Sequence, residues 1–280
     1  MDLIRIKAED EFELNGLLWE PEKKGDCMVI LVPGATTGAA LVAMHDYYPM
    51  ATALNNAGYS FIVSNMRASY NYPYAVYADA VKDIGGFVEY SKSKGYSKIA
   101  IVGISLGGPR TARYMAERGD PAVKVVAFVA SIPSPYLEFQ VRSSDADKKR
   151  LEQALQRARD LIAQGKELEP IGFENWFPDG RHFMMSAKSM VGFFGSPEDD
   201  APSSVGYGDR IKVPVLVLHG DSDELALPQN AQTIFDSMTA SPRRDLVWVE
   251  GASHYLTPGP IADAYARKLS DWIIKNMPSS

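Results

Sequence analysis

The chain has 280 residues, and 46% of them are hydrophobic, which is enough to bury a sizeable core in one large domain or two small ones. Its 35 acidic and 29 basic residues give a net charge of −6 without any basic block, and this pattern argues against a nucleic-acid partner. The N-terminus is charged every few residues, and no uncharged apolar run approaches the ~18 residues of a membrane-spanning helix, so we expect a cytoplasmic protein without a membrane span.

The chain starts with two segments, residues 2–8 and 11–21, in which apolar and polar residues alternate as in an antiparallel strand pair with one solvated face. Six nearly continuous apolar runs come after them, a pattern that is typical of strands buried on both faces of a sheet. These runs lie at residues 27–34, 59–65, 98–105, 123–131, 213–220 and 245–251.

Several stretches between these runs have the pattern of helices, among them residues 44–59, 77–95 and 107–120, and each is closed by a glycine. Strands that alternate with helices form a mostly parallel sheet covered on both faces. The sequence therefore predicts an α/β fold with a mostly parallel, eight-stranded sheet and helices on both faces.

The alternation of strands and helices stops between about Pro135 and Arg210, where no buried strand is visible. We interpret residues 135–209 as an α-helical insertion into a core made of residues 1–134 and 210–280. One helical face of its first half carries Leu151, Leu155, Ala158 and Ile162, with Ser143 or Ser144 as the cap and Gly165 at the end.

The second half of the insertion is rich in Phe, Trp and Met. Most of these residues are expected to pack the insertion onto the main domain. A second interpretation is that several of them line an apolar pocket, with Phe183, Met184 and Phe193 as candidate substrate contacts.

The segment from Gly103 to Gly107, with Ser105 at its centre, follows an apolar run and precedes a helix. A strand, the sequence Gly-x-Ser-x-Gly and a helix together form a nucleophile elbow, a tight turn that presents a serine at the carboxyl edge of a sheet. Both glycines relieve crowding around that turn. The sequence therefore predicts Ser105 as a nucleophile.

A serine hydroxyl needs a histidine base, and that base needs an acid to orient it. His254 lies in the loop after the last strand, and Asp223 lies at the end of the preceding strand, beside the alternative acids Asp221 and Glu224. The chain order Ser105, Asp223, His254 is the order expected when an elbow serine comes first.

On these motifs the sequence resembles a serine hydrolase of the α/β-hydrolase superfamily, esterase-like, over nearly the whole chain apart from the insertion. The resemblance implies that the insertion forms a cap or lid over the active site. It also implies an oxyanion hole built from the backbone N–H of Leu106 and that of Ala35, with Thr36 as the alternative donor. Thr36 and the segment after the fourth strand, with Arg67 and Tyr70, become candidate substrate contacts.

The leading hypothesis is cleavage of a carboxylic ester with a small to medium, largely apolar substrate, through an acyl-enzyme. The runner-up hypothesis has the same three residues act on a thioester, a lactone, an amide or a carbon–carbon bond, because these reactions share the nucleophile and the oxyanion hole. The alternative outside the enzymes is a protein of the same fold that binds a ligand without turning it over.

The sequence has one cysteine, Cys27, which excludes an internal disulfide and a cysteine-based zinc site. It also shows no His, Asp and Glu cluster at metal-ligand spacing and no glycine-rich phosphate loop. We expect a small-molecule substrate and no cofactor or metal. For the assembly, a monomer and a homodimer both stay open as alternatives.

Overall fold

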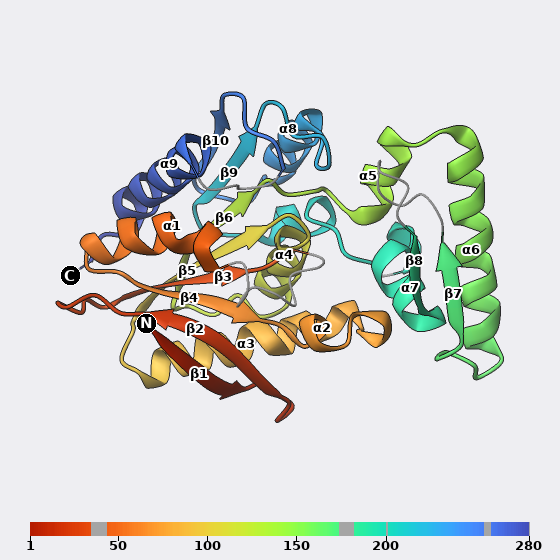
Figure 1. Ribbon diagram of the computed structural model, residues 1–280, viewed down its shortest axis with the longest axis horizontal. Helices are drawn as coiled ribbons and strands as arrows, with labels where there is room; N and C mark the ends of the chain where they lie inside the picture. The colour runs from red at the N-terminus through yellow and green to blue at the C-terminus, as the bar shows by residue number, and fades with distance from the viewer. Residues whose placement is uncertain (35–43, 174–181, 200, 255–258, 280) are drawn as a thin grey trace.

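The computed structural model describes residues 1–34, 44–173, 182–199, 201–254 and 259–279. Its centre is an eight-stranded sheet that runs through the middle of the molecule (Figure 1). Across the sheet the strands are β1 (Asp2–Lys7), β2 (Glu13–Trp19), β4 (Ser60–Asn65), β3 (Cys27–Val32), β5 (Lys98–Ile104), β6 (Val123–Val129), β9 (Val215–Gly220) and β10 (Arg244–Val249).

Strand direction in the sheet agrees with the sequence pattern. β1 and β2 pair antiparallel, β2 and β4 also pair antiparallel, and every other pair in this sheet is parallel. The predicted mostly parallel, eight-stranded sheet is therefore confirmed.

Both faces of the sheet are buried, and the alternation of side chains along β3 shows how. Met28, Ile30 and Val32 join one apolar core with helices α3 (Ala80–Ser93), α4 (Gly107–Glu117) and α8 (Pro228–Ser237). Cys27, Val29 and Leu31 join the opposite core with α1 (Met44–Asn56) and α9 (Pro260–Asn276). Because full burial of one such side chain contributes roughly 1.5–3 kcal/mol, a continuous apolar strand fits this central position.

The segment between β6 and β9 lies beyond the carboxyl ends of the parallel strands (Figure 1). We call residues 135–209 the insertion. Its elements are α5 (Pro135–Arg142), α6 (Asp145–Ala163), β7 (Pro170–Phe173), β8 (Phe183–Ser186), α7 (Ala187–Phe194), and the short helices η3 (Pro197–Asp199) and η4 (Val205–Arg210). The segment between β4 and α3 adds α2 (Arg67–Tyr70), η1 (Tyr72–Tyr74) and η2 (Tyr77–Asp79).

The expectation of a purely α-helical insertion needs a correction, because β7 and β8 form a two-stranded antiparallel sheet. Each strand has four residues, too few for an alternating pattern to stand out in the sequence. Ile171, Phe173 and Met185 belong to a third apolar core that the insertion shares with segments of the main domain, whereas Met184 is 68% exposed.

The long helix of the insertion follows the predicted pattern with one difference. The Ser144 hydroxyl accepts a hydrogen bond from the Asp147 N–H and caps α6, so Ser144 is the cap of the two candidates. Leu151, Leu155 and Ala158 are buried as predicted. Ile162 is 36% exposed, because in the last turn its neighbour Leu161 packs against the third core instead.

Candidate active site

Ser105 lies at the junction of β5 and α4, with a φ angle of 52°, a left-handed value that is rare for a residue with a side chain. The turn is tight enough to require its glycines. A Cβ atom on Gly103 would lie 2.5 Å from the carbonyl oxygen of Gly107, and one on Gly107 would overlap the carbonyl oxygen of Val32. The chain therefore makes the strand–turn–helix geometry that presents a serine hydroxyl at the sheet edge.

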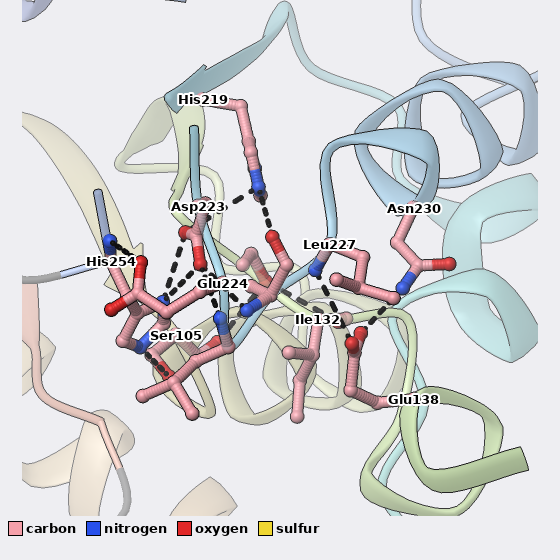
Figure 2. Close-up of polar contacts among 12 residues, drawn as sticks. Ser105, Ile132, Glu138, His219, Asp223, Glu224, Leu227, Asn230 and His254 are labelled. Carbon is pink, nitrogen blue, oxygen red and sulfur yellow. Dashed lines mark hydrogen bonds and ion pairs between the residues drawn. The ribbon is translucent and has the colours of Figure 1, made fainter. Parts of the chain in front are cut away.

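The Ser105 hydroxyl meets the imidazole of His254, with Oγ 3.1 Å from Nε2 (Figure 2). On the other side of the ring, Nδ1 lies 2.9 Å from Oδ2 of Asp223 and 3.1 Å from Oδ1. Because an ionised carboxylate can only accept, Nδ1–H donates to Asp223. Nε2 is then the acceptor for the serine proton, which is the arrangement that a general base requires.

Asp223 is buried, with 2% of its surface exposed, and its carboxylate is fixed by its own loop. Oδ1 accepts hydrogen bonds from the backbone N–H of Leu225, at 2.9 Å, and from that of Ala226, at 2.7 Å. These bonds leave the carboxylate little freedom to rotate away from the imidazole of His254.

The two alternative acids have other partners. Asp221 Oδ1 accepts from the N–H of Gly251 at 2.8 Å, and so ties the two loops together. Glu224 Oε2 accepts from the backbone N–H of His254 at 3.3 Å. Of the three carboxylates, Asp223 is the one that these contacts bring to the imidazole ring of His254.

A pocket opens beside Ser105 and His254 and encloses about 470 Å³ of space not filled by atoms, part of it open to solvent. Core loops and the insertion both contribute to its wall. The described residues of the wall are Tyr72, Ser105, Leu106, Ile132, Pro135, Glu138, Arg142, Phe194, Leu225 and His254. The wall is mainly apolar, with two charged side chains supplied by α5.

Glu138 is a site residue that the sequence reasoning missed. It is 2% exposed, and its carboxylate accepts hydrogen bonds from the backbone N–H of Leu227, at 3.2 Å, and from Nδ2 of Asn230, at 2.5 Å (Figure 2). Burial raises the pKa of Glu138 to about 7. A charged residue next to the buried Phe139 in an amphipathic helix was the only local signal.

His219 is a second buried side chain near Asp223. None of its surface is exposed, and its Nε2 lies 2.7 Å from the carbonyl oxygen of Ala226 and 3.6 Å from Oδ2 of Asp223. Burial lowers the pKa of this histidine, which favours its neutral form.

Leu106, a candidate donor to an oxyanion, is the N-cap residue of α4 and lines the pocket. The N–H groups at the start of a helix have no acceptor within the helix. The other candidate donors, Ala35 and Thr36, lie outside the described residues. The described part of that loop is held by the Arg110 guanidinium, which donates to the carbonyl oxygens of Pro33 and Gly34 at 3.0 and 3.2 Å.

Arg67 is not brought to the pocket. Its guanidinium donates to Asp83 Oδ1 at 2.7 Å and to Asp10 Oδ1 at 2.7 Å, and it also lies over the ring of Phe12. Tyr70 is close to this cluster, where its hydroxyl accepts from the backbone N–H of Asn15 at 3.1 Å. In this structure the side chains of Arg67 and Tyr70 therefore make contacts within the core domain, and their predicted role in substrate binding stays a prediction.

Two of the substrate contacts predicted in the insertion, Met184 and Phe193, are not among the described pocket residues. Phe193 is buried against Tyr72 and Tyr77, with ring centroids 5.0 and 5.7 Å away, and so supports the pocket wall from behind Tyr72. Met184 is exposed. The side chain of Phe183 is outside the described part of the structure. Phe194, adjacent to Phe193, is the aromatic residue of α7 that lines the pocket.

Within the described ranges, no three His, Cys, Asp or Glu side chains lie close enough together to hold a metal ion. In the same part of the chain, no helix has the length and apolar character needed to cross a membrane.

Residues 29–266 match the family model described as "Alpha/beta hydrolase family". The chain belongs to the alpha/beta hydrolase family. This match agrees with the parallel sheet, the strand–turn–helix at Ser105 and the position of the pocket at the carboxyl edge of the sheet.

Solved structures of the same fold include esterases and a lipase. The esterase domain of a Rhodothermus marinus protein is 14% identical, with a TM-score of 0.67 and 98% of each chain covered. Est1E from Butyrivibrio proteoclasticus is 17% identical, with a TM-score of 0.67 and 99% of each chain covered. A monoacylglycerol lipase from Paleococcus ferrophilus is 19% identical, with a TM-score of 0.64, over 95% of this chain and 100% of that one. At these identities the likeness shows a shared alpha/beta hydrolase fold, and family and neighbours together support a hydrolase.

Proposed function

We propose that this alpha/beta hydrolase cleaves carboxylic esters through an acyl-enzyme formed on Ser105. The observation that carries the proposal is the hydrogen-bonded series from Ser105 Oγ through His254 to Asp223, which borders the pocket. A serine hydroxyl is a weak nucleophile at neutral pH, and a base within hydrogen-bond distance removes that limitation.

In the first half of the reaction, Ser105 Oγ attacks the ester carbonyl carbon while its proton passes to Nε2 of His254. The resulting imidazolium is stabilised by Asp223, whose carboxylate accepts from Nδ1. Collapse of the tetrahedral intermediate breaks the carbon–oxygen bond, and His254 returns the proton to the leaving alcohol. The acyl group is then attached to Ser105.

In the second half, water takes the place of the serine as the nucleophile. His254 accepts a proton from this water and returns it to Ser105 Oγ when the acyl bond breaks, so the products are a carboxylic acid, an alcohol and the free enzyme. The backbone N–H of Leu106 and that of Ala35, or of Thr36, are the proposed donors to the negatively charged oxygen of each tetrahedral intermediate. Loss of one such donor typically costs ~10²–10³-fold in turnover.

The pocket wall supports a small to medium, largely apolar substrate. Ile132, Phe194 and Leu225 are apolar contributors from three separate parts of the chain. We propose that the insertion acts as a lid, because α5 supplies Pro135, Glu138 and Arg142 to the same wall. A closed apolar wall would exclude bulk water and strengthen the electrostatic interactions inside the site.

A panel of matched substrates tests this function. Wild-type protein and Ser105→Ala should be assayed on p-nitrophenyl esters from acetyl to long acyl chains, and on the thioester and anilide with the preferred acyl group. We expect the ester to be the best substrate, short to medium chains to be preferred, and Ser105→Ala to lose every activity. A dominant thioesterase or amidase activity would reassign the bond, and ligand binding without product would favour a binding protein.

A further inference from the structure

One peptide unit lies between two buried side chains, next to the proposed acid. The carbonyl oxygen of Ala226 accepts a hydrogen bond from Nε2–H of His219 at 2.7 Å. The N–H of Leu227, which belongs to the same peptide unit, donates to Oε1 of Glu138 at 3.2 Å. In a planar trans peptide the C=O and N–H groups point in opposite directions. His219 and Glu138 accordingly lie on opposite sides of this segment (Figure 2).

The same segment determines where Asp223 lies. The N–H of Ala226 donates to Oδ1 of Asp223 at 2.7 Å, and the carbonyl of Ala226 is the group that His219 binds. If the bonds at the Ala226 carbonyl and at the Leu227 N–H are lost, Ala226 is free to shift as a whole, and its own N–H then moves relative to Asp223. The position of the carboxylate therefore depends on how firmly this peptide is held.

We infer that Glu138 and His219 are positioning residues that hold the Ala226–Leu227 peptide from its two sides and thereby keep Asp223 in hydrogen-bond contact with His254. The inference rests on the proposed function, in which Asp223 orients the histidine base. Glu138 belongs to α5 of the insertion, whereas His219 belongs to β9 of the core. The insertion would therefore help to position the acid of the active site.

The chemistry of His219 suits a fixed donor. A carbonyl oxygen can only accept, so Nε2 carries the proton, and Nδ1 is buried with no partner among the described residues. The ring is held edge-on to Trp248, in the adjacent strand β10, with centroids 6.0 Å apart. A neutral histidine in this environment presents one N–H to Ala226 and adds no full charge beside Asp223.

The chemistry of Glu138 suits a fixed acceptor. Its two oxygens bind separate donors, the N–H of Leu227 and Nδ2 of Asn230, both at the start of α8. The charges that act on this carboxyl are Arg142, one turn along α5, and Asp223. With a pKa of about 7, Glu138 becomes the charged, stronger acceptor as the pH rises through neutrality.

The experiment combines single and double substitutions in the full chain. Glu138→Gln removes the charge with little change in volume, and His219→Phe keeps a ring while removing the donor. Each should lower kcat on p-nitrophenyl acetate about tenfold, since a small misplacement of a catalytic group is costly, while KM stays within about threefold. Because both act on one peptide unit, the double variant should lose no more than about twice what the worse single loses. His219→Gln, which restores a side-chain N–H, should recover part of the rate.

A matched control separates positioning from a general loosening of the insertion. Asp199→Asn weakens the Asp199–Arg159 ion pair, which joins two parts of the insertion away from the pocket. All rates should be normalised to the fraction of Ser105 that a fluorophosphonate labels, and melting temperatures should be recorded for every variant, so that unfolded protein is not counted as inactive.

The outcomes are distinguishable. Non-additive losses of kcat in the Glu138 and His219 variants, with Asp199→Asn within about twofold of wild type, support the inference. Unchanged kcat, losses that multiply, or an equal loss in Asp199→Asn would overturn it while leaving the ester hydrolase intact. A wild-type protein that neither hydrolyses esters nor labels on Ser105 would overturn the proposed function itself, and this inference with it.

Discussion

Ser105 and His254 are 149 positions apart in the chain, and their side chains lie 3.1 Å from each other at the carboxyl edge of the sheet. The parallel arrangement of β5, β9 and β10 explains the meeting, because the loops that follow these strands all emerge at the same edge. The chemistry proposed for the protein depends on this contact and on the Asp223 carboxylate behind it.

Asp223 should be far more important to turnover than the acids next to it. Asp223→Asn keeps the shape but offers Nδ1–H of His254 a weaker, partly donor group, and we expect kcat to fall by ~10³–10⁴-fold. Asp221→Asn and Glu224→Gln should each lose less than about tenfold, because these carboxylates bind backbone N–H groups and not the imidazole of His254. The check is ester hydrolysis by the three variants side by side, and equal losses would mean that the acid has been misassigned.

Gly103, two residues before Ser105, should be needed for the turn. In Gly103→Ala the new Cβ meets the carbonyl of Gly107, and the displaced turn should cost about 1–3 kcal/mol of unfolding free energy as well as most of the activity. Gly172→Ala, in β7, is the matched control, since no atom lies within 4 Å of its added Cβ. Urea unfolding and ester hydrolysis should be measured for both variants. A Gly103→Ala protein as stable and active as wild type would show that the turn tolerates a Cβ at this position.

Arg67 should matter for stability and not for substrate binding. Its side chain is 13% exposed and pairs with Asp83, which is 1% exposed, so Arg67→Ala leaves a buried carboxyl without its partner. Loss of one member of such a pair costs about 3–5 kcal/mol. We expect a lower melting temperature with KM within about twofold of wild type for the folded fraction. A large rise in KM at unchanged stability would restore the substrate role predicted from the sequence.

The pKa of Glu138 predicts a pH dependence of stability. In the folded protein this pKa is about 7, above the ordinary value of 4.5. Between these two values the folded state holds a proton that the unfolded state releases, so the contribution of Glu138 to the unfolding free energy decreases as the pH rises from 4.5 to 7. Over that window the loss amounts to roughly 3 kcal/mol, and it stays constant at higher pH.

Glu138→Gln removes this titration. Measured by urea unfolding at pH 5 and pH 8, the stability of the variant relative to wild type should improve at the higher pH. If the difference in unfolding free energy between the variant and wild type is the same at pH 5 and pH 8, the raised pKa of Glu138 is wrong. The charged form that costs stability is also the one that binds Leu227 most strongly, an expected cost of a functional site.

The sequence predicted the sheet well because buried parallel strands leave a distinctive pattern. β3 contributes side chains to both cores, so each of its positions must be apolar, and this gives a continuous run with no alternation. The position of Ser105 follows from the same physics, since a tight turn at the end of such a strand needs glycines on both sides.

Contacts between side chains and backbone from distant segments had no local signal. The contact between Glu138 and Leu227 joins residues 89 positions apart, and nothing in either neighbourhood specifies it. Arg67 was matched to a family pattern in sequence, but its three-dimensional surroundings contain Asp10 and Asp83, from distant segments. Pairing of charges across a fold is a tertiary property, which a pattern along the chain does not encode.

The most direct test of the proposed chemistry is reaction with a fluorophosphonate, followed by peptide mass spectrometry of wild type, Ser105→Ala and His254→Ala. This reagent reports an activated serine hydroxyl without requiring the natural substrate. We expect rapid labelling of wild type on the peptide that contains Ser105, and loss of that label in both variants. Labelling on another residue, or labelling of Ser105 that persists at the wild-type rate in His254→Ala, would mean that Ser105 is not a nucleophile activated by His254.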